Sequence, residues 1–334
     1  MTLDPASDPL STHRPERASR TAILTTVIAA FCSAGPEIVV AAEGGNGFYL
    51  LGQRGSRAAV LPPPGTYLRF DGYGYSGSQA DPIALGGGVD MDTEVDAILP
   101  VVTAAWLPEA RGPGGTRPFF AVSVISGWKD IATTIRFPGL DGGMVGSSAD
   151  ESDFLLGDPI LTAGLGGTGG NWHWSGALAV NVPVGDYSSD RLTNIAFNRW
   201  GLDGTAAVTW LDPISGWEAS LAAGLTWNGE NPDTDYDTGE EAHLEAAVSR
   251  SFASGLTLGL NGYHYRQITG DSGDGAQLGG FRGEVSALGP SIAFTADPGG
   301  WPLAAEARFY REFGAKNRTE GDALFITLVA PLPF

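Results

Sequence analysis

The feature that most constrains this chain is a pair of alternating segments between Trp200 and Trp227, joined by a short turn at 212–216. In both segments the apolar residues share one parity, and a tryptophan stands at each end. These residues are Trp200, Leu202, Gly204, Ala206, Val208 and Trp210, then Trp217, Ala219, Leu221, Ala223, Leu225 and Trp227. The opposite parity is small and polar. A period of two that occurs twice predicts a β-hairpin with one apolar face.

The spacing of the tryptophans distinguishes a membrane hairpin from a soluble one. Ten residues separate the members of each pair. At roughly 3.4 Å per residue and a strand tilt of about 40°, the rings lie roughly 25 Å apart along a membrane normal, as in the apolar band of an outer-membrane barrel. Cross-strand tryptophan pairs in a soluble sandwich are the alternative. We predict an aromatic girdle that comprises Trp172, Trp174, Trp200, Trp210, Trp217, Trp227 and Phe334.

The rest of the chain alternates strands with two kinds of connection. Glycine and proline are frequent, at 49 and 22 of 334 residues, and no long helical periodicity occurs. Short turns are expected at 166–170, 212–216, 251–255 and 297–301, and long loops at 128–152, 228–239 and 269–280. About 12 strands lie between these connections, and such barrels have even strand numbers. We therefore predict an all-β fold, an antiparallel transmembrane outer-membrane β-barrel over residues 65–334.

The N-terminal region has the features of a secretory signal peptide. A segment with three arginines precedes the apolar run 22–31, and small residues at 40–42 offer a cleavage site, so residues 1–42 are expected to be removed. A membrane anchor is the alternative, but the apolar run is too short. Cys32 is the only cysteine, and it would leave with this peptide. The mature chain would then suit an oxidising compartment, with no thiolate metal site.

Residues 43–64 contain three consecutive prolines at 62–64. Proline cannot donate a hydrogen bond to a strand ladder, so this segment is expected to precede the barrel. It could fold into the lumen as a plug or pack as an N-terminal strap.

Charge and the C-terminus indicate the partners. The net charge is −19 with 17% charged residues, so a basic footprint for nucleic acid is absent. The last residues, 324–334, are apolar on one parity and end in Phe334, which resembles the C-terminal signal for the bacterial barrel assembly machinery. Outer-membrane lipid is the other expected partner, and the expected localisation is the bacterial outer membrane.

Several motifs, in order, resemble one family. They are GFYLLG at 47–52, LPPPG at 61–65, FNRW at 197–200, NGENPDTDYDTG at 228–239, GYHYRQITGDSGDGA at 262–276, VSALG at 285–289 and YREF at 310–313. These segments resemble the outer-membrane transporters of the meta-pathway of phenol degradation family. The resemblance covers the mature chain almost end to end. It implies a barrel that passes small hydrophobic, aromatic growth substrates, and it implies no specific functional residues.

Lumen residues follow from strand parity, because a charged side chain facing the bilayer midplane costs roughly 2 to 4 kcal/mol. The charged candidates are Arg69, Asp71, Arg199, Asp203, Glu218, Glu241, His243, Glu245, Arg282, Glu284, Glu306 and Arg308. Their mixed signs suggest ion-paired ladders and not a selectivity ring. Tyr67, Tyr73, Tyr75 and Tyr310 are candidates for stacking an aromatic solute.

The strand near 256–267 does not fit a simple alternation. Leu256, Leu258 and Leu260 share a parity with His264 and Arg266, which would place two polar residues outside. A bulge near 261–262 would turn His264 and Arg266 inward, and we favour that bulge.

Alternative functions rest on weaker patterns. A structural or adhesive barrel with a plugged lumen is the first alternative. A bilayer lipid hydrolase would use His173 and Ser175, but that pair is predicted to face the lumen, so we do not expect an enzyme. Asp233, Asp235 and Asp237 form a weak calcium candidate whose glycine is one position too late. No cofactor is expected.

Overall fold

The computed structural model describes residues 47–79, 83–86, 89–138, 144–276, 279–296 and 303–332. No helix among these residues is long and apolar enough to cross a membrane. The signal-peptide prediction, Phe334 and the turn at 297–301 lie outside the described residues.

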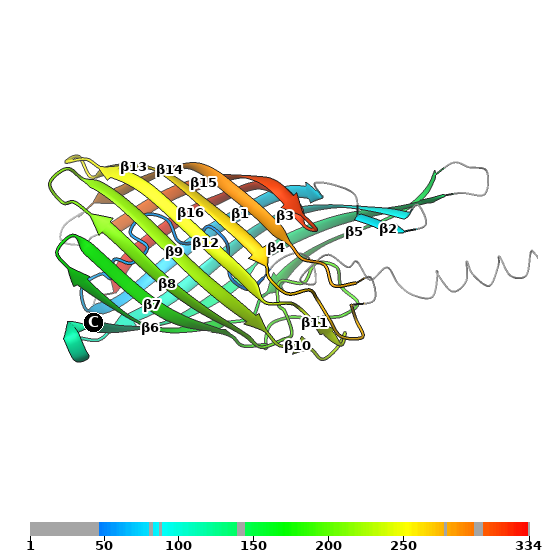
Figure 1. Cartoon of the computed structure of the whole chain (residues 1–334), viewed down its shortest axis with the longest axis horizontal. Helices are drawn as coiled ribbons and strands as arrows, with labels where there is room; N and C mark the ends of the chain where they lie inside the picture. The colour runs from blue at the N-terminus through cyan, green and yellow to red at the C-terminus, as the bar shows by residue number, and fades with distance from the viewer. Residues whose placement is uncertain are drawn as a thin grey trace, which may run out of the picture. The chain divides into compact units, whose positions relative to one another are not determined.

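Twelve antiparallel strands form a closed barrel (Figure 1). They are β1 (Gly65–Gln79), β3 (Val89–Leu107), β4 (Arg117–Pro138), β6 (Ile160–Gly169), β7 (Trp172–Asn181), β8 (Gly201–Leu211), β9 (Trp217–Asn228), β12 (Glu241–Ser251), β13 (Leu256–Gln267), β14 (Glu284–Ala296), β15 (Leu303–Lys316) and β16 (Thr319–Leu332). The ring closes because β1 pairs with both β3 and β16, and β3 pairs with β4. The predicted architecture and strand number are confirmed.

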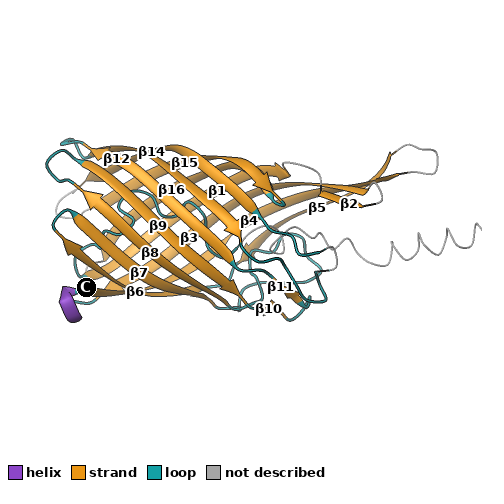
Figure 2. Cartoon of the chain, in the orientation of Figure 1, coloured by secondary structure: helices purple, strands orange, loops and turns teal. Residues whose placement is uncertain are grey.

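Strand β4 is longer than the barrel wall and pairs with two strands in succession. Its first part, up to Ser123, pairs with β6, and its second part, from Ser126, pairs with β5 (Met144–Leu156). Strands β5 and β6 therefore follow one line along β4, interrupted at residues 157–159. The prediction of a loop at 128–152 is wrong over most of its length. The end of β4 and most of β5 lie there as paired strands, which extend beyond the barrel (Figure 2).

The short elements lie in the connections. They are β2 (Ile83–Gly86), which pairs with β3, the pair β10 (Glu230–Asn231) and β11 (Tyr236–Asp237), and the 3-10 helix η1 (Pro113–Gly115).

Alternation along the strands produces an apolar outer face and a polar inner one. Strand β9 is the clearest case, since exposed and buried side chains alternate from Trp217 to Trp227. Leu221 and Leu225 point outward, whereas Glu218 and Ser220 are buried. Because a lipid-facing wall needs apolar side chains and closed backbone pairing, this pattern is that of a transmembrane barrel.

Strand β13 shows that the predicted bulge is wrong. Its residues pair with β12 and β14 in unbroken register from Leu258 to Arg266. Tyr263 and Tyr265 are buried inside, and His264 and Arg266 face outward. The outward polar residues lie at the loop end of the strand, where their side chains can reach water or headgroups, so no change of face is needed.

Candidate functional site: the barrel interior

Residues 47–64 pass through the barrel and contact inward-facing side chains of several strands (Figure 1). Phe48, Tyr49 and Ala59 are buried there. Four main-chain N–H groups of this segment donate to side chains of β8, β9 and β12. The acceptors are Glu245 Oε2 for Arg54 at 2.9 Å, Glu218 Oε1 for Arg57 at 2.5 Å, Ser220 Oγ for Ala58 at 3.3 Å and Thr209 Oγ1 for Ala59 at 3.1 Å.

The carbonyl groups of the same segment accept hydrogen bonds from other strands. Tyr310 donates to the carbonyl of Gly52 at 3.1 Å, and Arg69 Nη2 donates to that of Gln53 at 3.2 Å. Arg117 Nη2 donates to the carbonyl of Leu61 at 2.8 Å. The segment therefore lies between strands that supply acceptors and strands that supply donors. This arrangement satisfies backbone groups that would otherwise be buried without partners.

Tyr49 makes the most specific side-chain contact of the segment. Its hydroxyl donates to Glu245 Oε1 at 2.7 Å, and its ring stacks on His243 with a centroid separation of 3.6 Å. These two contacts attach the segment to the inner face of β12.

Several charged lumen candidates are paired, two of the pairs each along one strand and one across β9. Arg69 Nε lies 2.6 Å from Asp71 Oδ2, Arg308 Nη1 lies 3.0 Å from Glu306 Oε2, and His243 Nε2 lies 2.9 Å from Asp203 Oδ2. Glu218, Glu241 and Glu245 are also buried on the inner face of β9 and β12. Arg199, which precedes β8, is buried with its guanidinium 5.2 Å from the Phe197 ring.

Two predicted lumen residues lie elsewhere. Arg282 is exposed before β14 begins, and Glu284 shares its parity with the exposed Leu288. Glu284 pairs with Lys316 Nζ at 3.2 Å on the outer side of the loop end. The assignment of Arg282 and Glu284 to the lumen is therefore corrected. Strand parity does not predict the face of a side chain at this end of β14, because a bulge lies between Glu284 and Ser286 and the loop is near.

Aromatic side chains fill the interior beside β1, β13, β15 and β16. The buried cluster contains Tyr263, Tyr265, Tyr310 and Phe325, and Tyr73 and Tyr75 pack against it. The rings of Tyr263 and Tyr310 lie 5.1 Å apart, and those of Tyr73 and Phe325 lie 4.8 Å apart. Tyr67 faces the same side near the turn end, where its hydroxyl donates to the carbonyl of Pro63.

Glu312 joins several of these groups, and parity with Arg308 and Tyr310 was the signal that could have identified it. Its carboxylate accepts from Tyr75 at 2.9 Å, from Tyr263 at 2.8 Å and from the N–H of Gly321 at 2.9 Å. Arg318 Nη2 lies 3.7 Å from the same carboxylate. Glu312 therefore pairs with the hydroxyl groups of Tyr75 and Tyr263, while the rings of the cluster pack against one another.

A second buried carboxylate that the sequence did not reveal is Asp158, in the break between β5 and β6. It accepts from Asn181 Nδ2 and from the main-chain N–H groups of Val184, Gly185 and Phe197, at 2.8 to 3.1 Å. These contacts fix residues 182–200 against the ends of β5 and β7. No pattern in the sequence indicated that an aspartate in a short connection would be so completely buried.

The tryptophans of the predicted girdle point outward. Trp172, Trp174, Trp200, Trp217 and Trp227 are 44 to 59% exposed, and Trp210, opposite Trp172, is half-buried.

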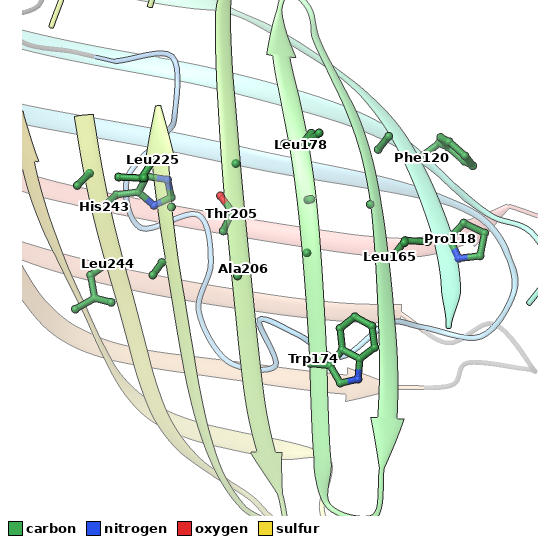
Figure 3. A pocket seen from close by; sticks show the side chains of 18 of the residues that line it. Pro118, Phe120, Leu165, Trp174, Leu178, Thr205, Ala206, Leu225, His243 and Leu244 are labelled. Carbon is green, nitrogen blue, oxygen red and sulfur yellow. The ribbon is translucent and has the colours of Figure 1, made fainter. Parts of the chain in front are cut away.

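An apolar groove of about 1150 Å³ lies on this outer wall and not in the lumen (Figure 3). Two adjacent rows of outward side chains across paired strands form most of it. One row contains Phe120, Ala163, Leu178, Gly204, Leu225, Ala242 and Arg266, and the other contains Pro118, Leu165, Gly176, Ala206, Ala223, Leu244 and His264. Small residues at the centre of both rows create the hollow, which faces lipid.

The weaker site candidates receive no support from geometry. His173 Nδ1 is 3.0 Å from Thr168 Oγ1, so the partner of the imidazole is Thr168 and not Ser175. Asp233 and Asp235 are exposed, and Asp237 pairs by its backbone with Ser272. Within the described ranges, no group of three or more His, Cys, Asp or Glu side chains could hold a metal ion.

Closed antiparallel pairing, a lipid-facing outer wall and a polar interior define a transmembrane β-barrel of the bacterial outer membrane. The family described as "Putative MetA-pathway of phenol degradation" matches residues 71–328. The chain belongs to this family, as the sequence motifs predicted. No curated protein is significantly similar to it in sequence.

A solved outer-membrane channel supports the fold. The COG4313 outer membrane channel from Pseudomonas putida F1 has a TM-score of 0.60 at 15% identity, covering 82% of this chain and 97% of that one. The translocator domain of autotransporter NalP from Neisseria meningitidis has a TM-score of 0.37 at 12% identity, covering 82% and 91%. A BenF-like porin from Pseudomonas fluorescens Pf-5 has 0.31 at 11% identity, covering 82% and 100%. The last two scores are too low to support a shared topology.

Proposed function

We propose that this protein is an outer-membrane channel through which small hydrophobic, aromatic compounds of the phenol class diffuse, without a cofactor or energy coupling. The observation that carries this proposal is the interior cluster of Tyr73, Tyr75, Tyr263, Tyr265 and Tyr310. Such side chains offer ring faces for stacking and hydroxyl groups for hydrogen bonds, which suits a weakly polar aromatic solute. The family to which the chain belongs, and the name of its structural neighbour as a channel, support the same function.

Residues 43–64 act in this proposal as a lumen plug. The contacts of residues 47–64 with inward side chains support that role, since a segment lying between donors and acceptors of the wall fills the path. Flux would then require the segment to shift or leave.

Flux through the refolded protein in liposomes tests the proposal. Phenol and benzoate should cross faster than through protein-free vesicles, and faster than a sugar of similar size. Deleting residues 43–64 should increase the flux of the aromatic compounds. Absence of flux through both the full-length and the shortened protein, each shown to be folded and inserted, would contradict the channel.

A structural or adhesive barrel is the second candidate. It is favoured by the number of hydrogen bonds that hold residues 52–61 inside the barrel, because a permanently filled lumen needs no solute. A variant without residues 43–64 that inserts normally and still conducts nothing would support this candidate over the channel.

A further inference from the structure

The buried part of the N-terminal segment places a phenol group on a specific pair of wall residues. The Tyr49 ring lies over the imidazole of His243 with an interplanar angle of 19°, and its hydroxyl donates to Glu245 at 2.7 Å. A tyrosine side chain is a phenol with an alkyl group in the para position. We propose that His243 and Glu245 form a binding subsite for phenols, and that Tyr49 occupies it as an internal substitute for the solute.

The stacking surface is held by residues other than Tyr49. His243 Nε2 lies 2.9 Å from Asp203 Oδ2, and Asp203 also accepts from Thr205 at 2.5 Å and from Thr226 at 2.8 Å. These contacts come from β8, β9 and β12, so the imidazole keeps its orientation when the segment moves. A surface that is already ordered binds a ring with little loss of conformational freedom.

Glu245 supplies the selectivity for a hydroxyl group. Its carboxylate accepts two hydrogen bonds from the described part of the N-terminal segment, one from the Tyr49 hydroxyl and one from the N–H of Arg54. Withdrawal of Tyr49 would leave a buried acceptor without that donor, which is costly. A phenol restores the bond, whereas toluene cannot, and sites built around a hydroxyl reject analogues that lack it.

The subsite adjoins the tyrosine cluster along the segment. Leu50 and Leu51, which follow Tyr49, pack against the cluster that contains Tyr263 and Tyr310. A solute that displaces Tyr49 would therefore have further aromatic surface beside it. This inference rests on the proposed function, since phenols meet the subsite as transported solutes.

Equilibrium binding to the full-length protein tests the subsite without measuring flux. Wild type and Tyr49→Ala are refolded in detergent and titrated calorimetrically with p-cresol, which reproduces the tyrosine side chain, and with toluene. Tyr49→Ala should bind p-cresol at least about tenfold more tightly than wild type and about tenfold more tightly than toluene, as expected when a buried acceptor would otherwise lack a partner. Adding Glu245→Gln should reduce the preference for p-cresol.

Two variants serve as controls. Tyr49→Phe keeps the ring on His243 and should bind p-cresol no better than wild type. Phe48→Ala empties a neighbouring buried position over Gly201, so any binding there should show no preference for the hydroxyl. Equal binding of p-cresol and toluene by folded Tyr49→Ala, or no gain over wild type, would overturn the subsite. The titration measures binding and the liposome assay measures flux, so the two proposals can fail separately. Selective p-cresol binding by a protein that shows no flux in liposomes would contradict only the proposed channel.

Discussion

Asp203 Oδ2 lies 2.9 Å from His243 Nε2, although these residues come from strands that are not adjacent. Strand β9 runs between them, and its Gly224 pairs with Thr205 on one side and with His243 on the other. A Cβ atom at Gly224 would collide with His243 Nε2. The absence of a side chain at position 224 therefore allows the imidazole to cross β9 and reach the carboxylate.

Gly224→Val should displace the imidazole and break its contact with Asp203. We expect a loss of about 1 to 3 kcal/mol in the free energy of unfolding, typical of overpacking, in urea unfolding followed by tryptophan fluorescence. Gly204→Val is the matched control on the outer face, where a Cβ atom would meet Leu178 and Trp227 at ordinary contact distances of 3.6 and 3.7 Å. Equal stability of the two variants would show that Gly224 does not provide this space.

Asp158→Ala should loosen residues 182–200 without unfolding the barrel. The substitution removes the acceptor of three main-chain N–H groups and the Asn181 amide, and each orphaned donor costs about 1 to 3 kcal/mol. Trypsin should cleave after Arg191 at least about tenfold faster, since cleavage follows the open population. Ser189→Ala, an exposed neighbour that leaves the charges beside Arg191 unchanged, is the control and should be cleaved at the wild-type rate.

Glu312→Ala should destabilise the barrel strongly. The change leaves the buried Arg318 without its carboxylate and the Tyr263 hydroxyl without its acceptor, whereas Tyr75 keeps Thr319 Oγ1 at 2.8 Å. Breaking a buried pair from one side costs about 3 to 5 kcal/mol. The control is Asp322→Ala, which removes an exposed ion pair with Arg311 and should change stability by less than about 1 kcal/mol. Similar urea midpoints for both variants would refute the central role of Glu312.

Replacing Trp200, Trp210, Trp217 and Trp227 together by glutamine should impair insertion. These rings face outward, and amphipathic rings at the margins of the apolar band stabilise a barrel in the bilayer. The measurement is the fraction of heat-modifiable protein on gels after refolding into liposomes. Ile214→Gln, in the tight turn at 95% exposure, is the control. Wild-type insertion of the fourfold variant would disprove the girdle.

The sequence predicted the barrel because alternation is a local property that a membrane enforces on every spanning strand. Alternation correctly assigned the outward side chains of β8 and β9 and buried residues such as Asp203 and Tyr310. Alternation failed as a guide outside the apolar band, where outward side chains need not be apolar. Residues 128–138 and 144–152 continue the strand pairing beyond the end of β6, and His264, Arg266 and Glu284 lie near loop ends where outward polar groups are tolerated.

Contacts between distant segments could not be predicted from periodicity. Tyr49 and Glu245 are 196 residues apart, and no spacing rule links a residue in an irregular segment to one strand among twelve. The burial of Asp158 likewise depends on the path of residues 182–200. The parity of the strands could have assigned Glu312, Tyr263 and Tyr265 to the interior. The assumed bulge instead assigned Tyr263 and Tyr265 to the outer face.

Residues 54–59 are attached to the wall largely through main-chain N–H groups. Every amino acid except proline carries such a group. Point mutations at the less buried positions Arg54, Arg57 and Ala58 are therefore expected to be tolerated in a lineage, whereas the accepting side chains of Ser220, Glu218 and Glu245 are constrained. Sequence variation among descendants of this gene should consequently be greater at Arg54, Arg57 and Ala58 than at these accepting positions of the strands.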